Sequence, residues 1–189
     1  VIILSASSKT AIGLAFGLSL IDDNRPKIVG LTSASNVDFI DKMSCYDFVI
    51  GYDNLDALPN TTSVLVDMSG NRVLTGSVHQ ALGDNMLWCH NVGLTHWDNR
   101  ENQNNSSDDP FIQERSAMFF APEHIAQGVK ELGALEYNKK VAGFLNDGIT
   151  HANGWMQVTQ TNGLSQFAQV YDRVVRGDMH AKVGNIIIP

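Results

Sequence analysis

Short apolar segments alternate with helix-forming segments along the first half of the chain, and this alternation limits the folds available to it. The expected strands are Val1–Leu4, Lys27–Leu31, Phe48–Ile50, Val64–Asp67 and Met86–Val92, and the expected helices are Ala11–Ile21, Val37–Met43 and Val73–Leu82. Strands that alternate with helices form βαβ units, whose parallel sheet is covered on both faces. The sequence therefore predicts an α/β fold, a doubly wound and mainly parallel sheet of six to seven strands in three layers (α/β/α).

The second half of the chain continues this pattern less regularly. A polar stretch, Asn99–Asp109, predicts an exposed loop before a sixth strand at Ser116–Phe120. Pro122 favours the start of a helix that ends near Gly133. The remaining expected elements are a helix at Leu135–Leu145, strands at Met156–Thr161 and Gly184–Ile188, and a helix between those strands at Leu164–Val175. No segment is long enough to serve as a linker, so residues 1–189 are expected to form one domain.

Charge and composition argue against several classes of protein. Thirteen Lys and Arg residues against twenty Asp and Glu residues give a net charge of −7, the wrong sign for a nucleic-acid-binding protein. No apolar run reaches the roughly 20 residues of a membrane-spanning helix. Two cysteines, Cys45 and Cys89, and the lack of a recognisable leader favour a cytoplasmic location. Because the chain begins directly in an apolar segment at Val1, we expect it to be one domain of a longer protein.

The histidines do not predict a metal site. None of the six has the spacing of a zinc ligand set, so no metal is expected. His96, beside Trp97 and just beyond the fifth strand, is the best placed for a proton relay. The favoured interpretation is that His96 belongs to an aromatic-rich loop that closes over the end of the sheet or packs on a domain absent from this sequence.

The loop between the first strand and the first helix carries the strongest indication of chemistry. It consists of Ser5, Ala6, Ser7, Ser8, Lys9, Thr10 and Ala11. Small residues that open a helix leave backbone N–H groups at its positive end, which favours the binding of a phosphate. Two alternatives remain open for this loop: an ordinary turn whose serines cap the helix, and a P-loop in which Lys9 and Thr10 act with Asp67. The glycines of the dinucleotide-binding motif G-x-G-x-x-G and of the P-loop motif G-x-x-x-x-G-K-[ST] are both absent.

Several motifs together resemble one protein family. They are Ser5–Ala11, Gly30–Ser33, Tyr46–Asp47, Tyr52–Asp53 and Val92–Trp97. This set resembles a family catalogued only as a domain of unknown function, which is similar to the medium-chain dehydrogenase/reductase superfamily and especially to its zinc-free quinone and enoyl reductases. The resemblance implies a Rossmann-like dinucleotide-binding domain, normally preceded by a GroES-like catalytic domain that this sequence does not contain. It also implies that the strand Gly184–Ile188 returns to that other domain.

The resemblance also implies which residues contact the cofactor. Ser5–Ala11 match the pyrophosphate loop, and Thr32 and Ser33 match the tip of the second strand, where an acid would bind the ribose of NAD. No acid stands there. Ser33 and Tyr52 match residues that surround the 2′-phosphate of NADPH in the resembled reductases. The basic residue that these reductases place between them corresponds to a position near Val37, where this sequence has no positive charge. The resemblance therefore favours NADP over NAD. The loops expected beside the nicotinamide are Met68, Ser69 and Gly70 after the fourth strand and Val92, Gly93, Leu94 and Thr95 after the fifth.

Two functions follow as alternatives. The first is the NAD(P)H-binding domain of a medium-chain reductase-like oxidoreductase that transfers hydride to a quinone, an enone or a similar carbonyl compound. The second is a stand-alone nucleotide-binding or interaction module without turnover. No catalytic residue can be assigned, so the isolated chain is expected to be inactive. An apolar sheet edge at Ser116–Phe120 further predicts a homodimer, as the resemblance also implies, unless the loop Asn99–Asp109 covers that edge.

Overall fold

The computed structural model describes residues 1–93 and 110–189, and the chain divides into two compact units, Val1–Glu131 and Leu132–Pro189. Leu94, Thr95, His96 and the expected loop Asn99–Asp109 lie outside the described residues. Among the helices of the described ranges, none has both the length and the apolar character needed to cross a membrane.

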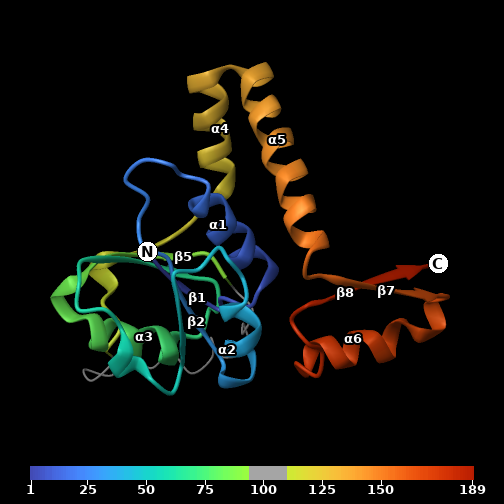
Figure 1. The fold of residues 1–189 in the computed structure, drawn as a ribbon, viewed down its shortest axis with the longest axis horizontal. Coiled ribbons are helices and arrows are strands. Elements are labelled where there is room, and N and C mark those ends of the chain that lie inside the picture. The colour runs from blue at the N-terminus through green and yellow to red at the C-terminus, as the bar shows by residue number, and fades with distance from the viewer. Residues whose placement is uncertain (94–109) are drawn as a thin grey trace. The chain divides into compact units, whose positions relative to one another are not determined.

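The first unit is built on a six-stranded parallel sheet in the order β3-β2-β1-β4-β5-β6 (Figure 1). The strands are β1 (Ile2–Leu4), β2 (Val29–Thr32), β3 (Phe48–Gly51), β4 (Ser63–Asp67), β5 (Met86–Asn91) and β6 (Ser116–Met118). The chain adds β2 and β3 on one side of β1 and then β4 to β6 on the other, so the strand order reverses between β1 and β4. This arrangement confirms the predicted doubly wound α/β fold.

Helices cover both faces of this sheet and complete the three layers. α3 (Arg72–Leu82) packs Val78 and Leu82 in one core cluster with Ile2 and Leu4 of β1. Ile3 is also fully buried, and it points to the opposite face because side chains alternate along a strand. α1 (Lys9–Ser19) covers that opposite face, since right-handed crossovers on the two sides of β1 place α1 and α3 on different faces (Figure 1). α2 (Ala34–Asp41) connects β2 to β3.

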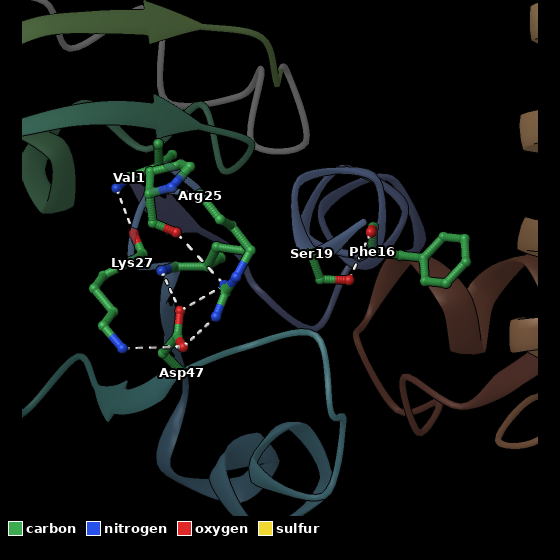
Figure 2. A network of polar contacts seen from close by, with 8 residues as sticks. Val1, Phe16, Ser19, Arg25, Lys27 and Asp47 are labelled. Carbon is green, nitrogen blue, oxygen red and sulfur yellow. Dashed lines mark hydrogen bonds and ion pairs between the residues drawn. The ribbon is translucent and has the colours of Figure 1, made fainter. Parts of the chain in front are cut away.

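An ion-pair network ties together the amino-terminal ends of three strands (Figure 2). Arg25 donates two hydrogen bonds to the carboxylate of Asp47, at 2.9 and 2.7 Å, and the same carboxylate accepts from the backbone N–H of Ile28 at 2.8 Å. The amino group of Val1 donates to the carbonyl of Lys27 at 2.7 Å. The hydrogen bond from Arg25 is the main reason why the pKa of Asp47 falls to about 2. Because this network precedes β1, β2 and β3, it stabilises the end of the sheet away from the expected cofactor loops.

The edge of the sheet differs from the prediction in one boundary. β6 ends at Met118, so Phe119 and Phe120 follow the strand rather than extend it. The chain turns directly into α4 (Ala121–Leu132), and the ring of Phe119 stacks on His124 of this helix with the ring centroids 4.5 Å apart. Phe119 is therefore partly covered by its own chain. The predicted position of β6 at an edge of the sheet is confirmed.

The second unit contains a long helix and a small sheet of its own. Its elements are α5 (Ala134–Asn153), β7 (Gln157–Asn162), α6 (Phe167–Val175) and β8 (Val183–Ile188). β7 and β8 pair in parallel and form a two-stranded sheet separate from the larger one. The strands expected at Met156–Thr161 and Gly184–Ile188 are thus present, but they add no seventh strand to the doubly wound sheet.

One face of the small sheet exposes three apolar side chains beside the polar Gln160 and Asn162. Val158 on β7 and Ile186 and Ile188 on β8 share this face through the strand register, and their exposed fractions are 53%, 47% and 42%. None of residues 132–189 reaches full burial. A two-stranded sheet is marginally stable by itself, and parallel sheets are normally covered on both faces. Within the second unit, these apolar side chains therefore stay exposed.

Candidate functional site

The loop between β1 and α1 is a compact turn held by its own serines. Ser5 has a left-handed backbone conformation (φ 55°), and its carbonyl accepts a hydrogen bond from the N–H of Ser8 at 2.8 Å. The side chain of Ser8 caps α1 by accepting from the N–H of Ala11 at 3.2 Å. Serine capping is therefore part of the local structure. The turn places the start of α1 at the carboxyl ends of the strands.

Lys9 adds a cation to the start of α1. It is the first residue of the helix, its side chain is exposed, and the first turn contains no acidic residue. Partial burial lowers the pKa of Lys9 from its ordinary value. The N–H groups of a first helical turn carry a partial positive charge. Together with Lys9 they make this part of the loop electropositive, which suits a phosphate group.

Two tyrosines hold the same loop from the β2–β3 side of the sheet. The hydroxyl of Tyr52 accepts from the N–H of Ser5 at 3.0 Å, and the hydroxyl of Tyr46 donates to the carbonyl of Ala6 at 2.9 Å. Gly30 makes room for this packing, since a Cβ there would lie 2.9 Å from both Ala6 and Tyr46. Burial raises the pKa of both phenols, so both are neutral at physiological pH. The loop is therefore rigidly supported.

The tip of β2 lies against this loop. The buried hydroxyl of Thr32 donates to the hydroxyl of Ser7 at 3.2 Å. Ser33 precedes α2, and its hydroxyl lies 3.1 Å from that of Ser35 and accepts from the amide of Asn36 at 3.0 Å. The first turn of α2 contains no acidic residue. The structure thus brings neutral hydrogen-bonding groups to the strand tip.

Asp67, the last residue of β4, organises the loop on the other side of β1. Its Oδ1 accepts from the N–H and the hydroxyl of Ser69, at 2.7 and 2.6 Å, and from the N–H of Gly70 at 3.1 Å. Its Oδ2 accepts from the hydroxyl of Thr75 at 2.9 Å. The residue is only 3% exposed. Because protein donors occupy both oxygens, the structure argues against the P-loop alternative, in which this carboxylate would hold magnesium.

The loop after β5 is attached to the same residue. The backbone carbonyl of Asp67 accepts from the N–H groups of Val92 and Gly93 at 2.8 and 2.9 Å. A Cβ on Gly93 would overlap the backbone of Met68, so the loops after β4 and β5 are in direct contact. The predicted residues that the structure brings together here are Met68, Ser69, Gly70, Val92 and Gly93. Leu94 and Thr95 lie outside the described residues.

The amino-acid sequence does not predict how Tyr46 and Asp67 support these loops. A carboxylate at the end of an apolar strand, followed by Ser69 and Gly70, was an available signal for Asp67. Tyr46 carries no such local signal. His79 has a structural role, since it is fully buried and its Nδ1 accepts from the N–H of Ile112 at 2.9 Å. Within residues 1–93 and 110–189, no three His, Cys, Asp or Glu side chains are grouped to hold a metal.

The strand order, the reversal point and the loops that meet there define a Rossmann-type α/β domain. The chain belongs to the family described as protein of unknown function (DUF2855), whose sequence profile matches residues 1–180. Its fold is similar to that of CurA from Vibrio vulnificus, whose crystal structure was determined in complex with NADPH. The TM-score is 0.61 and the sequence identity is 12%. The similarity covers 99% of this chain and 56% of CurA, so the chain spans little more than half the length of that protein. A comparison with curated proteins finds no match.

Proposed function

We propose that this chain is the NAD(P)H-binding part of an oxidoreductase of the medium-chain reductase type. The observation that carries the proposal is the electropositive start of α1 at the point where the strand order reverses. Open α/β sheets bind ligands in the crevice at this point, outside the carboxyl ends of the strands. The fold is shared with CurA, whose crystal structure contains NADPH.

In this proposal the loop Ser5–Ala11 binds the pyrophosphate. Its backbone lacks the glycines that allow the closest approach of a dinucleotide. Lys9 compensates, because a charge-assisted hydrogen bond to phosphate is stronger than a neutral one. The hydrogen bonds from Tyr46 and to Tyr52 keep the loop in one conformation before the ligand arrives, which lowers the entropy lost on binding.

The tip of β2 favours NADP over NAD. A carboxylate at this tip would bind the ribose hydroxyls of NAD and repel a 2′-phosphate. Here the tip carries Thr32 and Ser33, and the start of α2 carries no acid. The O–H of Tyr52 also remains able to donate, since a phenol that accepts one hydrogen bond keeps its donor. Hydroxyl donors beside a helix N-terminus suit the additional phosphate of NADP.

The nicotinamide nucleotide lies over the loops after β4 and β5 in this proposal. Met68–Gly70 and Val92–Gly93 form that wall, and Leu94 and Thr95, which lie outside the described residues, stay predicted contacts. The cofactor supplies the hydride, and the residues of this chain bind and orient it. The acceptor is a quinone, an enone or a similar carbonyl compound, and its pocket is completed by a part of the protein outside this sequence. The exposed apolar side chains of Val158, Ile186 and Ile188 support that view, because they offer surface for such a part.

A stand-alone nucleotide-binding or interaction module is the second candidate. The glycine-poor loop favours it, because serine and alanine stand in a segment where a dinucleotide site usually has glycine. This alternative predicts no hydride transfer under any condition. The two candidates share the fold and differ in whether a bound dinucleotide takes part in hydride transfer.

Titration of the chain with NADPH and NADH, followed by tryptophan and nicotinamide fluorescence, tests the proposal. We expect saturable binding of both, tighter for NADPH, and negligible NADPH oxidation with quinones or enones by this chain alone. Lys9→Gln should weaken binding by about tenfold, whereas Lys140→Gln, an exposed lysine of α5, should leave it unchanged. Absence of saturable binding up to about 1 mM would overturn the proposal and favour the interaction module.

A further inference from the structure

Both carboxylate oxygens of Asp67 accept hydrogen bonds from the protein itself, from the loop after β4 and from α3. Its side chain accepts four hydrogen bonds, from the N–H and hydroxyl of Ser69, the N–H of Gly70 and the hydroxyl of Thr75. A buried carboxylate is costly unless it is well satisfied. Hydrophobic residues would fill this position at the end of an apolar strand at lower cost. The hydrogen bonds that the carboxylate accepts therefore explain why a charged residue stands at this position.

These hydrogen bonds fix the backbone of the loop after β4. The N–H groups of Ser69 and Gly70 both turn inward to the carboxylate, and Gly70 adopts a left-handed conformation with φ 63°. The hydroxyl of Ser69 also accepts from the N–H of Asn71, which caps α3 by accepting from the N–H of Leu74. The carboxylate thus determines the path of the chain from the end of β4 to the start of α3.

The carbonyl of the same residue controls the neighbouring loop. It accepts hydrogen bonds from the N–H groups of Val92 and Gly93. The segments that follow β4 and β5 are therefore both bonded to one residue. Gly93 then rests directly on the backbone of Met68. A displacement of either loop would break contacts in the other. Asp67 is the residue common to both.

The strand order indicates which part of a dinucleotide these loops would face. A sheet in the order 3-2-1-4-5-6 consists of two mononucleotide-binding halves, and the adenosine half lies over the side that contains β2. The loops after β4 and β5 belong to the other half. They therefore face the nicotinamide nucleotide.

We propose that Asp67 is a positioning residue for the nicotinamide half of the dinucleotide site. It holds the loops after β4 and β5 in the binding conformation through its carboxylate and its carbonyl, without touching the cofactor itself. This inference rests on the proposed function, because it assigns a role within that site. It predicts that weaker hydrogen bonds to the Asp67 side chain reduce the affinity for a whole dinucleotide and leave the affinity for its adenosine half unchanged.

The test compares two ligands on the full chain, NADPH and adenosine 2′,5′-bisphosphate, which is the adenosine half alone. Asp67→Asn keeps the shape and removes the charge, and charge-assisted hydrogen bonds are about twice as strong as neutral ones. We expect this variant to bind NADPH about tenfold more weakly and the half ligand with unchanged affinity. Amide hydrogen exchange should quicken at Ser69, Gly70, Val92 and Gly93.

Two further variants complete the experiment. Thr75→Val removes the partner of Oδ2 and keeps the charge, so a smaller loss of NADPH affinity in the same direction is expected even if Asp67→Asn does not fold. Ser63→Ala, at the opposite end of β4, should change neither affinity. Equal loss of both ligands in the Asp67 and Thr75 variants, or no loss of either, would overturn the inference while the proposed function stands. A wild-type chain that binds neither ligand would overturn both.

Discussion

The hydroxyl of Tyr52 accepts a hydrogen bond from the backbone N–H of Ser5 at 3.0 Å, although the two residues are 47 positions apart in the sequence. This bond joins the end of β3 to the loop after β1. Ser5 holds a left-handed conformation, which costs a non-glycine residue about 1 kcal/mol or more. The loop conformation thus depends on a residue that directly follows β3, a strand that is not adjacent to β1 in the sheet.

Replacing Tyr52 by Phe should destabilise the protein and weaken dinucleotide binding. The variant leaves the partly buried N–H of Ser5 without its acceptor, which we expect to lower the free energy of unfolding by about 1–2 kcal/mol. Urea unfolding and NADPH titration measure the two effects. Tyr171→Phe, a change at a residue that is 56% exposed, is the control and should alter neither. Unchanged unfolding and binding in Tyr52→Phe would show that the loop holds its shape without this bond.

Gly93→Ala and Gly143→Ala should act in opposite directions. A Cβ at Gly93 overlaps the backbone of Met68, so the loops after β4 and β5 must separate. We expect the free energy of unfolding of Gly93→Ala to fall by about 1–3 kcal/mol. NADPH binding should weaken as well. Gly143 lies inside α5 with nothing within 4 Å of a Cβ, so alanine should stabilise the helix by about 0.5–1 kcal/mol. Thermal unfolding measures both changes. Equal effects at the two positions would contradict the contact between the loops.

The ion pair between Arg25 and Asp47 predicts an acid-dependent loss of stability. The pKa of Asp47 is lowered from 3.8 to about 2, chiefly by the hydrogen bond from Arg25. A carboxyl group whose pKa is depressed by folding stabilises the fold above its ordinary pKa, and this contribution disappears as the pH falls through the folded pKa. Asp47→Asn should therefore be less stable than the wild type at neutral pH, and the difference should shrink between about pH 4 and pH 2.

Urea midpoints of the wild type and Asp47→Asn at several pH values measure this difference. Asp23→Asn, at an exposed position, serves as the matched control. A gap between wild type and Asp47→Asn that stays constant from neutral to acid pH would show that the carboxylate contributes no charge-dependent stability.

The position of β6 at the edge of the six-stranded sheet predicts a homodimer. β6 is an edge strand, and Met118 and the adjoining Phe120 are 57% and 55% exposed. Pairing of β6 with a second copy would satisfy its backbone groups and cover these side chains. Light scattering should give twice the monomer mass of 20.7 kDa. Met118→Lys should restore the monomer, whereas Leu135→Lys, in the second unit, should not. A wild-type mass near 20.7 kDa would contradict this prediction.

Local sequence patterns were enough to predict the α/β class, the succession of strands and helices in the larger sheet, and the position of the loop Ser5–Ala11. These features follow from local patterns. Short β-branched runs predict strands, and Ser8 three positions before Ala11 is a local capping signal that the structure contains. Such information needs no knowledge of which segments meet in space.

The tertiary structure alone decided which residues meet. The pairing of β7 with β8 in a separate sheet, the support of Ser5 and Ala6 by Tyr52 and Tyr46, and the hold of Asp67 on two loops all depend on strand order and register. The sequence pattern of a strand specifies which face is buried, but it does not specify which strand lies beside it. Hydrogen bonds between distant residues arise only once that order is set, because each requires two groups to approach within about 3 Å.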